Sequence, residues 1–116
     1  MIITIGEISL TATLAENSSA KELSKLLMNR SITIPMKDYG GFEKVGPLGQ
    51  NLPTNDEPIS TKAGDLILYQ GNSFVIYYST NSWNFTRLGQ IDNITADELK
   101  QILGSGDITV TLSITK

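Results

Sequence analysis

The sequence contains neither cysteine nor histidine among its 116 residues. Without cysteine there is no disulfide bond, no thiolate nucleophile and no thiolate ligand for a metal ion, so stability has to come from packing. Without histidine the chain has no side chain whose ordinary pKa lies near neutrality, and it lacks the commonest metal ligand. Acid–base chemistry would therefore depend on a carboxylate, a lysine or a tyrosine with a shifted pKa.

Long apolar runs and clusters of basic residues are also absent. No stretch of about eighteen apolar residues occurs, so we expect no membrane span. The first residues lack the charged start and apolar core of a signal peptide, which favours the cytoplasm. A formal net charge of −3 argues against nucleic acid or an anionic membrane as a partner. The glycines between residues 40 and 49 lack the Lys-Ser/Thr ending of a phosphate-binding loop. We expect this protein to hold no metal ion and no other cofactor.

The composition is that of an ordinary globular chain. Apolar residues make up 40% of the sequence and charged residues 18%, which is far from the composition of disordered proteins. A chain of this length has room for one hydrophobic core. We therefore expect a single domain over residues 1–116.

Polar and apolar residues alternate strictly near both ends of the chain. Residues 8–14 and 108–114 show a period of two, which is typical of strands with one buried face. Residues 2–5 are predicted to form a hairpin with the first of these segments.

A second hairpin is predicted in the middle of the chain. Residues 66–69 and 74–78 are continuously apolar, and Gly71-Asn72 between them is a turn signal. Continuous apolar runs are typical of strands that are covered on both faces or that form a tightly curved barrel wall. A further strand is predicted over residues 86–91. Four glycines and three prolines lie within residues 39–62, which we predict to be a loop that lines a site.

Two short helices are predicted from their capping signals. Ser19 followed by Glu22 forms one capping box, and Thr95 followed by Glu98 forms a second one. Gly104 is placed to end the helix that begins at the second box. Each helix has an apolar stripe that it cannot bury alone, so we expect it to lie across an open end of a barrel. The predicted fold is therefore mainly β (all-β class), a closed or nearly closed barrel of about eight strands capped by two short α-helices.

Four blocks of the sequence resemble one known family. They are the N-terminal hairpin with its capped helix, ITIPMKDYGGFEKVGPL, the pair GDLILY and FVIYY, and FTRLGQI before the second helix. In order and spacing they resemble the small prokaryotic cyclophilin-like proteins, which share the cyclophilin barrel but have no established activity. The resemblance covers nearly the whole chain and implies a cyclophilin-like barrel.

The sequence departs from true cyclophilins where their catalysis takes place. The stretch 42–50 is similar to their catalytic strand, but Lys44 would take the place of the arginine that polarises the prolyl peptide. An ammonium group lacks the rigid fork of donors that a guanidinium offers. The stretch 72–76 is similar to the apolar floor of that site, with one aromatic ring in place of two and no glutamine. The resemblance thus implies the barrel without an intact prolyl isomerase site.

Nine residues are candidates for ligand contact, and none is assigned a catalytic role. They are Met36, Tyr39, Phe42, Glu43, Lys44, Gln50, Tyr77, Trp83 and Arg87. Neighbours on a strand point to opposite faces, so at most one of Glu43 and Lys44 enters a given cleft. Most of the aromatic residues between 69 and 85 are expected in the core, with Trp83 at a rim. Arg87 is expected either to bind an anionic group or to pair with a surface carboxylate.

The leading functional hypothesis is a domain that binds a small molecule or an extended, proline-containing peptide in a cleft on the barrel. One alternative is a weak or degenerate peptidyl-prolyl isomerase. Another is a structural or protein-interaction module, including a homo-oligomer that forms through an exposed strand. Whether the chain is an enzyme stays open at this point, with the lost isomerase set favouring a non-catalytic role.

Overall fold

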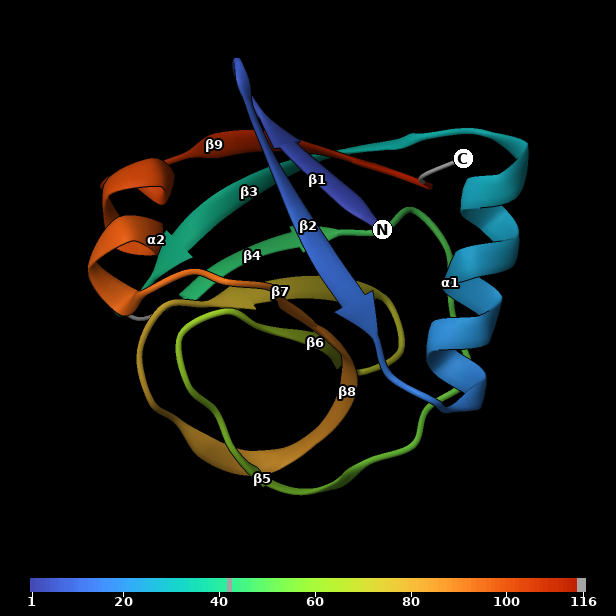
Figure 1. The fold of residues 1–116 in the computed structure, drawn as a ribbon. Coiled ribbons are helices and arrows are strands. Elements are labelled where there is room, and N and C mark those ends of the chain that lie inside the picture. The colour runs from blue at the N-terminus through green and yellow to red at the C-terminus, as the bar shows by residue number, and fades with distance from the viewer. Residues whose placement is uncertain (42, 115–116) are drawn as a thin grey trace.

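The computed structural model describes residues 1–41 and 43–114. Within these ranges the chain forms nine strands and two helices. In chain order they are β1 (Ile2–Ile5), β2 (Ile8–Leu14), α1 (Ser18–Asn29), β3 (Ile32–Tyr39), β4 (Glu43–Pro47), β5 (Glu57–Ser60), β6 (Asp65–Tyr69), β7 (Ser73–Tyr77), β8 (Ser82–Ile91), α2 (Ala96–Leu103) and β9 (Ile108–Ser113). Figure 1 shows these elements along the chain.

Eight of the strands close into a barrel. Their order around the wall is β2-β1-β9-β3-β4-β7-β6-β8, and a pairing of β2 with β8 completes the ring. Every pairing of neighbouring strands in this wall is antiparallel. The remaining strand, β5, pairs with the first half of β8 and lies outside the ring. The predicted mainly β barrel with two helices is confirmed.

The alternating segments at the two ends of the chain lie side by side in the wall. Strand β1 pairs with β2 on one side and with β9 on the other. Ile3 stands opposite Leu10 and Leu112 in these two registers, and it is fully buried in the barrel interior. The period-two pattern therefore buries one face of these strands, as the sequence predicts.

The central hairpin is formed by β6 and β7, but its turn differs by one residue from the prediction. Gln70 and Gly71 both have positive φ, 53° and 78°, and Asn72 N–H donates to Tyr69 O at 3.3 Å. Two consecutive positive φ angles are typical of the turns that match the right-handed twist of the flanking strands. The turn therefore centres on Gln70-Gly71, one residue before the predicted pair.

The prediction of a loop over residues 39–62 is wrong in two places. Strand β4 lies between β3 and β7, whose backbone groups supply both of its ladders. Strand β5 is an edge strand next to β8, and an edge position tolerates Pro58. Glycine and proline gave these segments a loop-like composition, and strand pairing with neighbours overrode it.

One of the two predicted helix caps is correct. Thr95 and Glu98 form the predicted capping box of α2, and Gly104 is its C-cap with a φ of 66°. Helix α1 instead begins after Asn17, whose Oδ1 accepts from Ala20 N–H at 2.8 Å. Ser19 lies inside the helix, and its hydroxyl donates to the carbonyl oxygen of Pro53.

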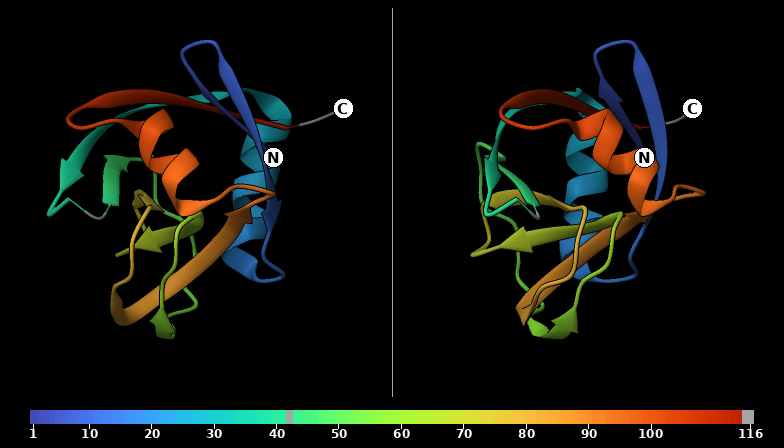
Figure 2. Two further views of the ribbon diagram at one scale, coloured as in Figure 1. Left: turned by 60° about the vertical axis from the view of Figure 1, so that its left-hand side comes forward. Right: turned by 90° about the vertical axis from the view of Figure 1, so that its left-hand side faces the viewer.

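The helices lie at opposite sides of the barrel and contribute to the same core (Figures 1 and 2). Leu23 and Leu27 of α1 and Leu99 and Leu103 of α2 belong to one buried cluster with the inward-facing strand residues. Two amphipathic helices thus cover apolar surface that the strands leave open. Within the described ranges, neither helix has the length and apolar character needed to cross a membrane.

A second, smaller apolar cluster lies on the outer face of the wall. It consists of Ile59, Ile67, Val75, Tyr77 and Phe85, with Val45 packed against it. Strands β6 and β7 are therefore buried on both faces, which explains their continuously apolar sequences.

Candidate functional site

A cleft opens on the outside of the barrel, beside this second cluster. Its volume is about 450 Å³. Its lining comes from Tyr39, Glu43, Val45, Tyr69, Gln70, Ser73, Val75, Tyr77, Asn81, Trp83 and Phe85. The strand residues in this set alternate along β4, β7 and β8, so their side chains share one face of the sheet. The first half of β8, paired with β5, extends beyond the rest of the barrel (Figure 2). Trp83 and Phe85 of this segment line one side of the cleft.

Five of the eleven residues that line the cleft are aromatic. Tyr77 and Phe85 are buried, with ring centroids 5.6 Å apart, and Tyr69 meets Phe85 at 6.3 Å. Tyr39 and Trp83 lie at the rim, each 65% exposed. Large apolar side chains exposed next to a cavity are typical of a surface that a ligand covers.

The charged group of the cleft is Glu43. It stands opposite Tyr77 in the β4–β7 register, is 7% exposed, and is hydrogen-bonded to the Tyr77 hydroxyl. That hydroxyl also accepts from Asn81 Nδ2–H at 3.2 Å. Burial raises the pKa of Glu43 above its ordinary value, the negative charge of Asp38 adds to the increase, and the hydrogen bond from Tyr77 opposes it. Burial likewise raises the pKa of Tyr77 to about 12.

Lys44 points to the opposite side of the wall, into the barrel. Its side chain is fully buried, and Nζ donates to Gly106 O at 2.6 Å and forms an ion pair with Asp38 Oδ1 at 3.1 Å. The ammonium group also lies 5.8 Å from the ring centroid of Tyr78, whose hydroxyl donates to Asp38. The hydrogen bond from Tyr78 and then the contact with Lys44 lower the pKa of Asp38. The charge of Lys44 is therefore paired inside the barrel, and Lys44 does not line the cleft.

A sequence model of the cyclophilin-like family matches residues 3–113 of the chain. The chain belongs to the cyclophilin-like family. Neither the curated proteins nor the solved structures contain a significant match to it. Membership in this family agrees with the closed barrel described above and, by itself, does not identify a ligand or a reaction.

Four of the nine candidate residues of this cyclophilin-like chain lie together in the cleft. They are Tyr39, Glu43, Tyr77 and Trp83. Met36 is buried in the barrel interior, and Gln50 lines a separate shallow depression next to Asn72. Phe42 lies outside the described residues.

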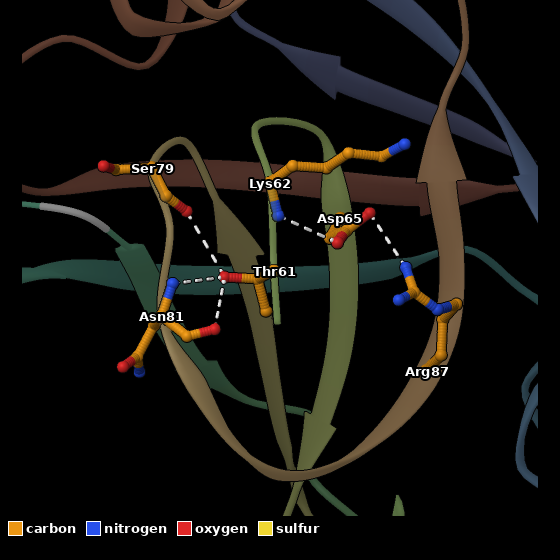
Figure 3. A network of polar contacts seen from close by, with 6 residues as sticks. All are labelled: Thr61, Lys62, Asp65, Ser79, Asn81 and Arg87. Carbon is orange, nitrogen blue, oxygen red and sulfur yellow. Dashed lines mark hydrogen bonds and ion pairs between the residues drawn. The ribbon is translucent and has the colours of Figure 1, made fainter. Parts of the chain in front are cut away.

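Arg87 is held away from the cleft by an ion pair. Its Nη1 lies 2.9 Å from Oδ1 of Asp65, a carboxylate that is fully buried (Figure 3). The other oxygen of Asp65 accepts from Lys62 N–H at 3.0 Å. Arg87 therefore compensates a buried carboxylate, where the sequence predicted either an anionic ligand or a surface partner. The bond from Lys62 N–H also fastens the loop before β6 to the first residue of that strand.

A polar network fixes the edge of the cleft that carries Asn81. The buried hydroxyl of Thr61 accepts from Asn81 N–H at 2.8 Å and faces the carbonyl oxygens of Asn81 and Ser79 at 3.1 and 3.3 Å (Figure 3). This network joins the segment before β6 to the turn between β7 and β8. It keeps Asn81 within reach of the Tyr77 hydroxyl.

Several cleft residues were outside the set predicted from the sequence. Tyr69 and Phe85 were recognised only as part of an aromatic-rich region, and the cleft also includes Val45, Val75 and Asn81. A signal for three of them is present in the sequence, because Val45 follows Glu43 by two residues, Phe85 follows Trp83 by two and Val75 precedes Tyr77 by two. Using that signal requires knowing that the outer face of these strands forms the site.

Proposed function

We propose that this protein is a binding module whose outer cleft takes a small molecule or an extended peptide. The observation that carries the proposal is a cleft of about 450 Å³ in which aromatic rings surround a few polar groups. Ligand sites in proteins typically have this volume and this mixture of apolar walls and sparse polar groups. Membership in the cyclophilin-like family accounts for the barrel fold, and the cleft is what supports a binding function.

The arrangement of the cleft supports binding by a largely preformed site. Its floor rests on the doubly covered strands β6 and β7, and Thr61 ties down the turn that carries Asn81. A preformed site loses little conformational entropy when a ligand binds. Tyr39 and Trp83 at the rim offer exposed apolar surface that binding would bury.

The same cleft gives little support to prolyl isomerisation. The barrier to rotation about a peptide bond is about 18–20 kcal/mol, and lowering it requires donors that are fixed around the twisted amide. Lys44, the residue at the position of the cyclophilin arginine, is bound to Gly106 and Asp38 inside the barrel. No basic side chain lines the cleft among the described residues. We therefore propose binding without isomerase activity.

The proposal is tested by titrating a panel of metabolites and Ala-Pro peptides. Trp83 is the single tryptophan of the chain and lies at the cleft rim, so its fluorescence reports on occupancy directly. Ser73→Phe places a ring in the cleft and is expected to weaken any binding about ten-fold or more, measured by calorimetry. Ser9→Phe adds the same ring to an exposed position of β2 and is expected to leave binding unchanged.

Two results would overturn the proposal. The first is that no compound of the panel changes the Trp83 fluorescence or releases heat. The second is a ligand that Ser73→Phe and Ser9→Phe bind equally well, because that ligand would occupy another surface. The absence of catalysis is tested separately with a protease-coupled assay on an Ala-Pro peptide, in which no acceleration is expected at micromolar protein.

A further inference from the structure

We propose that the ligand of the cleft carries a large, weakly hydrated organic cation, such as a methylated ammonium group. This inference rests on the proposed binding function and specifies its ligand. Two features of the cleft carry it, the aromatic wall and the buried carboxylate of Glu43.

The aromatic wall offers the first part of a cation site. Tyr69 and Phe85 are inclined by 60°, and Tyr77 and Phe85 by 56°. Rings inclined in this way form a curved wall and not a flat stack. With Tyr39 and Trp83 at the rim, five aromatic side chains line the same cavity. The face of an aromatic ring attracts cations, and the attraction is greatest for cations that lose little hydration on binding.

Glu43 offers the second part. Among the described residues that line the cleft it is the single charged side chain. A buried carboxylate is costly unless an opposite charge or several hydrogen-bond donors compensate it. Its hydrogen bond with the Tyr77 hydroxyl supplies a neutral donor. A bound cation would supply the missing charge.

Three basic side chains lie on the strands that line the cleft, and none of them forms an ion pair with Glu43 among the described residues. Lys37 of β3 is exposed and stands opposite Val45. Lys44, the neighbour of Glu43, is turned into the barrel and pairs with Asp38. Arg87 pairs with Asp65. Asp38 adds a further negative field at Glu43. The cleft therefore presents uncompensated negative charge to whatever enters it.

Other classes of ligand fit this chemistry less well. An anion would meet the charge of Glu43 without a donor of opposite charge. A neutral apolar group would bury the carboxylate further and leave it uncompensated. A small hydrated metal ion needs several oxygen ligands, whereas the described lining holds a single carboxylate among five aromatic side chains. An organic cation with an apolar surface satisfies the rings and the carboxylate together.

The test compares choline with 3,3-dimethylbutanol, its neutral isostere, and adds N-acetyl-trimethyllysine as a longer probe. We expect the two cations to change the Trp83 fluorescence at concentrations about ten-fold or more below those needed for the alcohol. Glu43→Gln keeps the shape of the side chain and removes its charge, and it should weaken cation binding about ten-fold or more. Glu7→Gln removes the same charge from the exposed turn between β1 and β2 and should leave binding unchanged.

The outcomes separate this inference from the proposed function. Equal binding of choline and its isostere, or equal binding by Glu43→Gln and Glu7→Gln, would overturn the cation while the cleft remains a binding site. Binding of neutral metabolites or Ala-Pro peptides in preference to all cations would do the same. Failure of every probe, charged or neutral, to change the Trp83 fluorescence would overturn both.

Discussion

Glu43 and Lys44 show how one peptide bond can separate two opposite environments. Both side chains leave β4, one toward the outer cleft and one into the barrel. Lys44 has a carboxylate, a carbonyl oxygen and an aromatic ring as partners, so its charge is compensated. Glu43 has the Tyr77 hydroxyl and no cation in contact with it among the described residues. The stability of the protein should therefore depend on the protonation of Glu43.

Glu43→Gln is predicted to raise the free energy of unfolding at neutral pH by about 1 kcal/mol. The folded-state pKa of Glu43 is raised above the ordinary value of 4.5 by burial, so the folded protein keeps this proton to higher pH than the unfolded chain does. Wild-type stability therefore falls as pH rises from about 4.5 through the raised pKa. The gain from Glu43→Gln should be absent below this window and full above it, as urea denaturation at a series of pH values would show.

The matched control for this measurement is Glu7→Gln. Glu7 is exposed in the turn between β1 and β2, so its removal should change stability little at any pH. A wild-type protein that is more stable than Glu43→Gln at pH 7 would contradict the prediction. It would mean that the hydrogen bond from Tyr77 outweighs the cost of burial.

For these side chains the sequence predicted a pair of possible environments but could not decide which one each side chain occupies. Strand alternation required Glu43 and Lys44 to face opposite ways, and only the positions of β3 and β7 decide which side is the cleft. The sequence predicts that Arg87 meets either an anionic ligand or a surface carboxylate. Its partner, the buried Asp65, is twenty-two positions away in sequence and becomes a neighbour only through the β6–β8 pairing. Partners that folding brings together leave no local pattern.

The two helices differ in how well their ends could be predicted. Thr95 and Glu98 are the residues that cap α2. At α1 the chain offers Asn17, Ser18 and Ser19 in a row, each a good N-cap residue. Asn17 is the N-cap because its side-chain amide makes two hydrogen bonds. Oδ1 accepts from Ala20 N–H, and Nδ2 donates to the carbonyl oxygen of Arg87 on β8 at 2.8 Å.

Asn17→Ala is predicted to lower the free energy of unfolding by about 1–2 kcal/mol, since it removes both the cap and the bond to β8. Asn17→Asp keeps an acceptor for the cap and loses the donor to Arg87 O, so its cost should lie between zero and that of the alanine variant. Asn29→Ala, at the exposed end of α1, is the control and should change stability little. Equal stability of Asn17→Ala and Asn29→Ala in chemical denaturation would show that the cap lies elsewhere.

Amino-acid composition predicted the strands that are buried on both faces. It failed for the strands whose extended conformation depends on pairing with distant neighbours. The continuously apolar sequences of β6 and β7 predicted strands that are covered on both faces or that form a tightly curved barrel wall, and in the structure these strands lie in the barrel wall and are buried on both faces. Strands β4 and β5 contain Gly46, Pro47 and Pro58, and this composition wrongly predicts a loop. Their extended conformation depends on neighbours far away in sequence, which no local pattern contains.

At the scale of the whole molecule, one contact determines whether the sheet is a barrel. Ala12, Thr13 and Leu14 of β2 pair with Ile91, Gln90 and Gly89 of β8, and this pairing closes the ring. The alternation near both ends of the chain indicated strands of a common wall. It could not indicate that β2 and β8 are the strands that meet, because closure depends on the shear of the complete barrel.

Gly89 allows this closure, and Gly89→Ala is predicted to lower the free energy of unfolding by about 3 kcal/mol. A Cβ at this position would lie 2.4 Å from the carbonyl oxygen of Thr13 and 3.1 Å from Cα of Leu14. Both are backbone atoms, so β2 and β8 would have to move apart to make room. The loss should appear in urea denaturation together with faster hydrogen exchange of Ala15 N–H, which donates to Leu88 O at 2.8 Å across the closure.

The control for this variant is Gly6→Asn in the turn between β1 and β2. A Cβ at Gly6 would meet no atom within 4 Å, and its φ of 59° is one that asparagine tolerates. The control should cost less than about 1 kcal/mol and leave exchange of Ala15 unchanged. If Gly89→Ala were as stable as Gly6→Asn, β2 and β8 could separate without loss. The barrel would then be held by its other pairings, and closure would contribute nothing to the stability of the wall on which the cleft lies.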